Sequence, residues 1–223
     1  INVLEACILA GVPYILIASS SEIFGDLNSS KIHETSVFNP KSGYAISKLS
    51  AEKYVEGFHK DYGIDYNIVR FFNIYGPGQV AEFVLPRFIK MVQSGISPKI
   101  YGDGKQIRSF CHISDVSKAV VDIFLNKKAQ NKTFNIGNDL EPITILKLAT
   151  KIVTMLGAHL KPEFLSFEDS DRNSSREIYN RVPDISKIKE YVGYTPKIML
   201  EEGIKDVISS GEIPESWADP IIK

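Results

Sequence analysis

The chain has 223 residues, of which 43% are hydrophobic and 24% are charged, and its formal net charge is −1 at pH 7. That length can hold a substantial core in one or two domains. The balanced charge argues against a nucleic-acid surface or an electrostatic membrane anchor, and no apolar run approaches the ~20 residues that span a bilayer. The two cysteines, Cys7 and Cys111, and four scattered histidines form no metal or redox spacing, so we expect no metal site and a cytoplasmic protein.

The first predicted elements are a helix over residues 2–10 and a strand over 14–18. Gly11 and Pro13 suit positions just past a helix end. Because this helix precedes the first strand and has nothing before it to pack upon, we expect the chain to be the later part of a longer protein.

A polar loop with turn signals covers residues 26–43. From Tyr44 to Tyr62 apolar side chains recur close to the 3.6-residue period, which predicts a helix that Gly63 ends. Residues 67–72 are rich in β-branched and aromatic side chains, which predicts a strand. Two strands separated by a helix of this length predict a parallel βαβ crossover.

The second half continues the alternation of helices and strands. Ser114 and Thr144 are the predicted N-caps of two of its helices. Predicted helices cover 82–94, 114–124, 144–156, 184–192 and 200–209, predicted strands cover 99–101, 107–110 and 133–136, and 168–176 is a polar loop. The chain is therefore predicted to be an α/β protein.

Two stretches carry the residues from which a site could be built. The hydroxyls and the carboxylate of residues 19–25 directly follow an apolar strand, at the kind of sheet edge where open α/β folds bind ligands. Tyr44 and Lys48 are four residues apart and share one face of their predicted helix. An ammonium one turn from a phenol favours the phenolate. We therefore expect the two stretches to form one catalytic site.

Four blocks occur in this order: Ser-Ser-Ser-Glu-Ile-Phe-Gly (19–25), Tyr-Ala-Ile-Ser-Lys (44–48), Arg-Phe-Phe-Asn-Ile-Tyr-Gly-Pro (70–77) and Arg-Ser-Phe-Cys-His-Ile-Ser-Asp-Val (108–116). With them the chain resembles the extended short-chain dehydrogenase/reductases, specifically the NAD-dependent epimerase/dehydratase group acting on nucleotide sugars. One Tyr-x-x-x-Lys alone is a weak signal, whereas four ordered blocks are a strong one. The resemblance implies the C-terminal part of a doubly wound, Rossmann-like parallel sheet plus a smaller α/β substrate-binding domain.

The same resemblance divides the chain into two parts. Residues 1–77 with 112–137 would be the remainder of the Rossmann-like domain, and 78–111 with 138–223 the nucleotide-sugar-binding domain. The family's glycine-rich phosphate loop is missing from the sequence. Gly102-Asp103-Gly104 does not replace it, because a short strand rather than a helix follows. We expect NAD as the cofactor, without excluding NADP, and poor dinucleotide binding by these residues alone.

The resemblance also implies roles at the two stretches. Tyr44 would be the base that takes the proton of a sugar hydroxyl, Lys48 would hold the nicotinamide ribose, and Ser20 would hydrogen-bond the reacting oxygen. The alternative is that Tyr44 is a half-buried helix aromatic, Lys48 a solvated charge and Ser20 a strand-end cap. The expected cofactor-binding residues are Ala18, Ser19, Tyr44, Lys48 and Phe71.

Glu22 could separate the reaction types. A 4-keto sugar has an acidic C5–H, which a nearby carboxylate can remove as general base. Members resembling 4,6-dehydratases and decarboxylases carry a Glu here, although thymidine-linked dehydratases have an Asp where this chain has Ser21. Arg181 matches an Arg that decarboxylase-like members place near the substrate. The alternative is that Glu22 is an exposed carboxylate beside a turn.

Substrate contacts are implied mainly for the second half. Asn73 would bind the diphosphate region, the fork of Arg108 would pair with phosphate, and Tyr101 would stack on the base or pack beside it. Asp115 is expected to belong to its helix cap. The expected substrate-binding residues are Ser21, Asn73, Phe83, Val84, Leu85, Tyr101, Arg108, Arg176 and Arg181.

These features predict an NAD-dependent nucleotide-sugar epimerase/dehydratase that acts on a UDP-, GDP- or dTDP-linked sugar. We expect these 223 residues alone to be inactive. Glu22 is its candidate base for a 4,6-dehydratase or decarboxylase reaction. The alternatives are a UDP-sugar 4-epimerase, a 4-keto-sugar reductase using NADPH, or a truncated, non-catalytic sugar-nucleotide-binding module. Family analogy also predicts a homodimer through the helix of Tyr44 and the helix before it.

Overall fold

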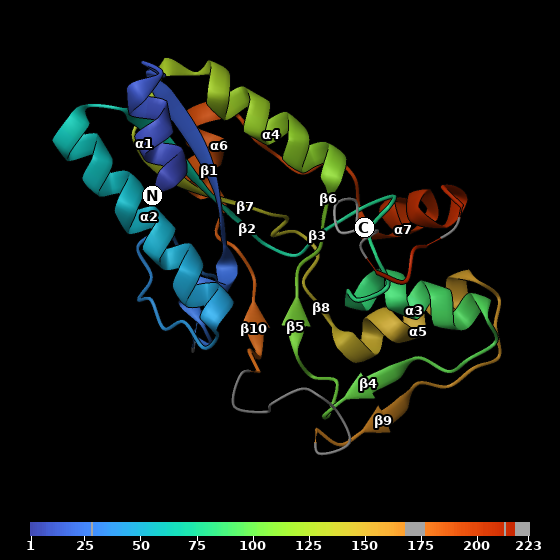
Figure 1. Ribbon diagram of the computed structural model, residues 1–223. Helices are drawn as coiled ribbons and strands as arrows, with labels where there is room; N and C mark the ends of the chain where they lie inside the picture. The colour runs from blue at the N-terminus through green and yellow to red at the C-terminus, as the bar shows by residue number, and fades with distance from the viewer. Residues whose placement is uncertain (28, 168–176, 212, 217–223) are drawn as a thin grey trace, which may run out of the picture.

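The computed structural model describes residues 1–27, 29–167, 177–211 and 213–216 (Figure 1). The helices are α1 (Asn2–Leu9), α2 (Gly43–Tyr62), α3 (Val84–Gln93), α4 (Ile113–Leu125), α5 (Ile145–Met155), α6 (Ser186–Val192) and α7 (Leu200–Ser209), with 3-10 turns η1 (Ser21–Phe24) and η2 (Lys127–Ala129). The strands are β1 (Tyr14–Ser20), β2 (Asp65–Phe71), β3 (Ile74–Tyr75), β4 (Lys99–Tyr101), β5 (Ile107–Arg108), β6 (Cys111–His112), β7 (Lys132–Ile136), β8 (Ile143–Thr144), β9 (Glu163–Leu165) and β10 (Asn180–Arg181). Among these helices none is long and apolar enough to cross a membrane.

The main sheet has the order β1-β2-β7, and both strand pairs are parallel. The chain passes from β1 through α2 to β2, so the predicted βαβ crossover is confirmed. Helices α1 and α2 lie on one side of the sheet, and α4 and α6 lie on the other (Figure 1). Since the strands are parallel, the ends of β1 and β2 meet at one edge, where Ser20 pairs with Phe71.

Alternation along β2 decides which side chains face which helix layer. Val69 packs in a core with α4 and α6, together with Val116, Ile123 and Phe134. Its neighbour Arg70 points to the other side and reaches α2. The predicted α/β class is confirmed by this layered arrangement.

A second group of elements lies beyond the edge of the main sheet (Figure 1). It contains the sheet β10-β5-β8 and the pair β4-β9, covered by α3, α5 and α7. Phe88, Ile152 and Ile204, one from each of these helices, are fully buried in a common core. This core explains the period of the predicted helices 82–94, 144–156 and 200–209.

The predicted division into two domains stays a prediction. Residues 138–223 fall in its second part, yet Ile185, Ile188 and Tyr194 pack in the core of the main sheet with Phe134. The segment around α6 therefore packs with the first part.

Several local predictions differ from the structure. Helix α4 begins at Ile113 with His112 as N-cap, so the predicted cap Ser114 is wrong, whereas Thr144 accepts the N–H of Lys147 at 3.2 Å as predicted. Asp115 does not cap α4, because its carboxylate accepts the N–H groups of residues 197 and 198 at 2.9 and 3.0 Å. That contact ties α4 to the segment before α7.

Some predicted boundaries also change. Helix α6 begins at Ser186 rather than at 184, and the predicted strand 107–110 shortens to the two residues of β5. Cys111 is fully buried, and burial raises the pKa of its thiol to about 12, whereas Cys7 is only partly buried. The two-residue strands β3, β6, β8 and β10 have no period to detect, so the sequence does not predict them.

Gly25, at the end of η1, occupies a backbone position that suits only glycine. Its φ is +62°, and a Cβ there would collide with the carbonyl oxygen of Asn39. We therefore expect Gly25→Ala to lower the free energy of unfolding by about 3 kcal/mol, since left-handed strain and backbone collision act together. Denaturant titration measures this. Gly57 lies within α2, and an added Cβ there would meet open space. Gly57→Ala should therefore raise the free energy of unfolding by about 0.5–1 kcal/mol.

Candidate functional site

Polar side chains follow β1 without a break. The Oγ of Ser20 accepts the N–H of Glu22 at 3.2 Å and caps η1. Ser19 and Ser21 are buried, and the Ser19 Oγ has no hydrogen-bond partner among the described residues. The serine-rich run is thus a strand end that turns directly into a 3-10 helix.

Tyr44 and Lys48 lie at the start of α2. Ser42 caps this helix by accepting the N–H of Ala45 at 3.1 Å. The Nζ of Lys48 donates to the carbonyl oxygen of Ala18 on β1 at 3.0 Å and lies 5.7 Å from the Tyr44 ring centroid. The Tyr44 side chain is half exposed. Lys48 therefore ties the start of α2 to β1, one residue before the serine-rich stretch.

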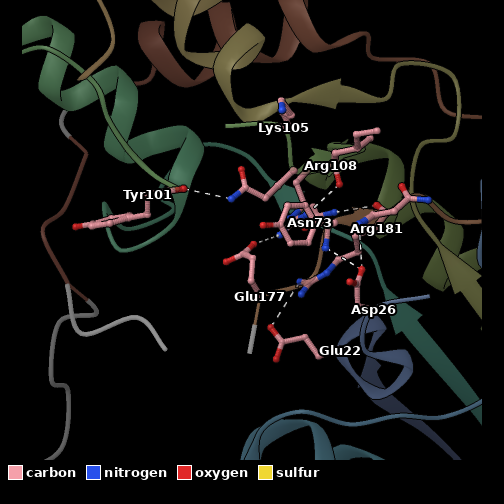
Figure 2. Close-up of polar contacts among 12 residues, drawn as sticks. Glu22, Asp26, Asn73, Tyr101, Lys105, Arg108, Glu177 and Arg181 are labelled. Carbon is pink, nitrogen blue, oxygen red and sulfur yellow. Dashed lines mark hydrogen bonds and ion pairs between the residues drawn. The ribbon is translucent and has the colours of Figure 1, made fainter. Parts of the chain in front are cut away.

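A cavity of about 320 Å³ lies next to this strand end. Its lining includes seven residues predicted to bind substrate or take part in catalysis: Glu22, Asn73, Phe83, Val84, Tyr101, Arg108 and Arg181. It also includes side chains that the sequence analysis did not select, among them Glu82, Arg87, Lys99, Gln106 and Glu177. Figure 2 shows several of these groups around one space. The lining residues come from segments far apart in the chain, so no local pattern predicts that they line one cavity.

The other predicted site residues lie outside that lining. Leu85 is buried in the core of α3, α5 and α7, and Phe71 packs partly buried against the core beside α4. Ser20, Tyr44 and Lys48 lie at the strand end rather than among the lining residues. Arg176 lies outside the described residues.

Glu22 and Arg181 connect the strand end to the cavity. Their side chains form an ion pair with 3.6 Å between the Arg181 Nη1 and the Glu22 Oε1 (Figure 2). The Oγ of Ser42 donates to the Glu22 Oε2 at 3.4 Å. Burial lowers the pKa of the Arg181 guanidinium, and the charges of Glu22 and Glu177 oppose that shift.

Arg108 forms the second ion pair of the cavity. It lies beside Arg181, because β5 and β10 pair in parallel with these two residues in register. Its Nη2 donates to the Glu177 Oε1 at 3.1 Å, and its Nη1 donates to the carbonyl oxygen of Ile107 at 3.0 Å (Figure 2). Two guanidinium groups side by side make this wall suitable for an anionic ligand.

Asn73 occupies the corner between the strand end and that wall. Its φ is +41°, a left-handed conformation that Asn tolerates better than most residues. Its Nδ2 lies 3.4 Å from the carbonyl oxygen of Ser109 and 3.5 Å from that of Arg181. Asn73 thereby holds three separate segments around the cavity.

Comparison with known proteins places this geometry in a family. The family model described as "NAD dependent epimerase/dehydratase family" matches residues 1–137. The chain is 31% identical over 209 residues to the UDP-glucuronate 4-epimerase of Thermodesulfobacterium geofontis, covering 94% of this chain and 62% of that protein. It is 33% identical over 216 residues to the UDP-N-acetyl-alpha-D-glucosaminuronate decarboxylase of Bacillus cytotoxicus, covering 93% and 66%.

A solved structure with the same fold is the dTDP-glucose 4,6-dehydratase DesIV of Streptomyces venezuelae, which holds NAD. The TM-score is 0.85 at 26% identity, covering 94% of this chain and 63% of that one. The match confirms the Rossmann-like architecture that the four sequence blocks predict. This chain spans 62–66% of the length of these three relatives. It belongs to the NAD-dependent epimerase/dehydratase family of nucleotide-sugar enzymes.

Proposed function

We propose that this chain is the catalytic and sugar-nucleotide-binding part of an enzyme that oxidises a nucleotide sugar to a 4-keto intermediate. The observation that carries the proposal is the contact between the two halves of the site. Lys48 links Tyr44 to the end of β1, and Glu22 on the following turn pairs with Arg181 in the cavity. A sugar held in the cavity by its diphosphate would reach the Tyr44 side of the site.

The residues present fit the nicotinamide end of NAD, the cofactor of the family. Ser19 offers a buried hydroxyl without a partner among the described residues, and Tyr44 and Lys48 lie at the same strand end. Ala18, Ser19, Lys48 and Phe71 would contact that end. When bound, NAD accepts hydride from the sugar carbon.

The proton of the oxidised hydroxyl would go to Tyr44. Only a phenolate can accept this proton, and that anion is stabilised by the positive charge of a nearby ammonium. Lys48 supplies that charge 5.7 Å from the ring centroid. The Ser20 Oγ, although it accepts the N–H of Glu22, keeps its own hydrogen to donate to the sugar oxygen.

We propose that Glu22 transfers the C5 proton in the step after oxidation. As a carboxylate it would take that proton in a 4,6-dehydration, and as a carboxylic acid it would return a proton to C5 after the loss of carbon dioxide in a decarboxylation. Arg181 would bind an anionic group next to Glu22, and the names of two of the relatives contain a uronate. A 4-epimerase remains the second candidate, because one relative carries that name and the geometry of Tyr44 and Lys48 serves both reactions.

The proposed function is tested by supplying the full-length enzyme and NAD with UDP-, GDP- and dTDP-linked sugars. Liquid chromatography with mass spectrometry of the products separates the reactions, because chromatography resolves an epimer from a substrate of the same mass. A 4-keto-6-deoxy sugar indicates dehydration, carbon dioxide indicates decarboxylation, and an isobaric product indicates epimerisation. Consumption of NADPH with a 4-keto sugar indicates the reductase alternative. No turnover with any of them would leave only the binding module.

Arg108 should hold the diphosphate. We expect Arg108→Gln to raise the Kd for UDP about 10- to 100-fold, because a charge-assisted hydrogen bond is lost and Glu177 then repels the phosphate. Isothermal titration measures this. Lys105→Gln is the control, since Lys105 is exposed and pairs with Asp103 at 3.6 Å. Equal affinity of Arg108→Gln and the unchanged protein would remove Arg108 from the site.

We also propose that the protein forms a homodimer through α1 and α2. Leu9, Tyr54 and Tyr62 on these helices are exposed apolar side chains of the kind that interfaces bury. Sedimentation of the full-length enzyme should give twice the monomer mass, and substitution of Tyr54 and Leu9 by Asp should return it to the monomer.

A further inference from the structure

A buried ion pair joins α2 to the main sheet. Arg70 on β2 is 3% exposed and Glu52 on α2 is 0% exposed. The Nε and Nη2 of Arg70 donate to the two carboxylate oxygens of Glu52 at 2.9 and 2.7 Å. Two parallel bonds between planar groups restrict both distance and rotation, so the pair fixes the orientation of α2 on β2.

The pair shares a helix face with the proposed catalytic residues. Tyr44, Lys48 and Glu52 follow one another at intervals of four residues, which brings them to one side of α2. Lys48 bonds the Ala18 carbonyl on β1, and Glu52 bonds Arg70 on β2. Arg70 is paired across the sheet with residue 19, directly after Ala18. The helix is therefore attached to two adjacent strands at nearly the same level.

Arg70 also contacts the other segments of the site. Its Nη1 donates to the carbonyl oxygen of Glu34 at 2.7 Å. Its guanidinium carbon lies 5.1 Å from the ring centroid of Phe24 and 5.0 Å from that of Phe38. Phe24 is the last residue of the turn η1, which contains Glu22. One guanidinium thus contacts α2, η1 and the loop between them.

We propose that Arg70 and Glu52 are positioning residues, which hold Tyr44 and Lys48 in register with Ser20 and Glu22. The inference rests on the proposed function of that site. Stability alone is a poor reason for such a pair, because the cost of removing two charges from water offsets their attraction, and an apolar pair of similar size would serve as well. An apolar pair, however, makes no pair of parallel hydrogen bonds, and so it does not set the rotation of α2.

The test replaces the pair by Arg70→Met with Glu52→Leu in the full-length enzyme. These side chains fill similar volume and leave no charge unpaired. We expect Tm to stay near that of the unchanged enzyme and KM for the nucleotide sugar to stay within about twofold, while kcat falls on the order of 100-fold. Arg70→Lys keeps the charge without the fork and should recover part of kcat. Lys118→Gln with Asp122→Asn, which removes a surface ion pair on α4, should change neither parameter.

Hydrogen exchange gives a second measurement that needs no turnover. Amides of residues 44–52 should exchange faster in the double variant, although Tm is unchanged. An unchanged kcat with unchanged exchange in a folded double variant would overturn the proposal, as would a kcat loss fully explained by a smaller folded fraction. If the unchanged enzyme turned over no nucleotide sugar, the proposed function would fail, while exchange in α2 would still decide the positioning role.

Discussion

Tyr44→Phe in the full-length enzyme is expected to lower kcat about 10³-fold with little change in KM. The substitution removes only the hydroxyl that would take the sugar's proton. The ring and its position 5.7 Å from the Lys48 Nζ remain, so the loss would report proton transfer rather than packing. Steady-state rates with the best substrate of the panel, together with the melting temperature, measure it.

The matched control is Tyr62→Phe at the far end of the same helix. Tyr62 is exposed and packs on Phe58 with 5.2 Å between ring centroids. Loss of its hydroxyl should leave kcat unchanged. Full activity in Tyr44→Phe would show that another group takes the proton, and the assignment of the catalytic base would be wrong.

Glu22→Gln should separate oxidation from the step that follows it. Gln keeps the shape of Glu and can still accept the hydrogen bond of Ser42, but it cannot take a proton from C5. We expect the oxidation step to stay within about tenfold, while the later step falls about 10³-fold. Quenched-flow mass spectrometry should then find an accumulating 4-keto sugar, with reduced nicotinamide detected by absorbance.

Glu82→Gln is the control for Glu22, because Glu82 lines the same cavity. It should not cause the 4-keto sugar to accumulate. If Glu22→Gln left every step unchanged and the product were the C4 epimer, Glu22 would have no chemical role. The 4-epimerase would then replace the dehydratase and decarboxylase as the function of this chain.

Much of the fold follows from local signals. The apolar period of residues 44–62 and the glycine at 63 are signals within one segment, and the structure confirms the helix that they predict, which Ser42 caps. The parallel order of β1 and β2 follows from a helix between two strands. Tyr44 and Lys48 are recognisable for the same reason, because a spacing of four residues on a helix already makes them neighbours.

Other contacts depend on segments that only the tertiary structure brings together. Glu22 meets Arg181 because β10 lies beside β5 at the edge of the cavity. Glu177 meets Arg108 across 69 positions of sequence, and neither residue has a local pattern that predicts the other. The cap of α4 by His112 was missed because histidine is not a usual N-cap residue.

Arg70 shows most clearly the difference between what local signals predict and what tertiary contacts decide. In the sequence it is one residue of a strand and of a family block, and nothing nearby reveals its partner. In the structure its guanidinium is buried between α2, η1 and the loop, paired with Glu52. The sequence by itself determined the family, the α/β class and the two stretches with the proposed catalytic side chains, because those signals are local. The tertiary structure decided which distant charges face them, since strand register and burial arise only when the whole chain packs.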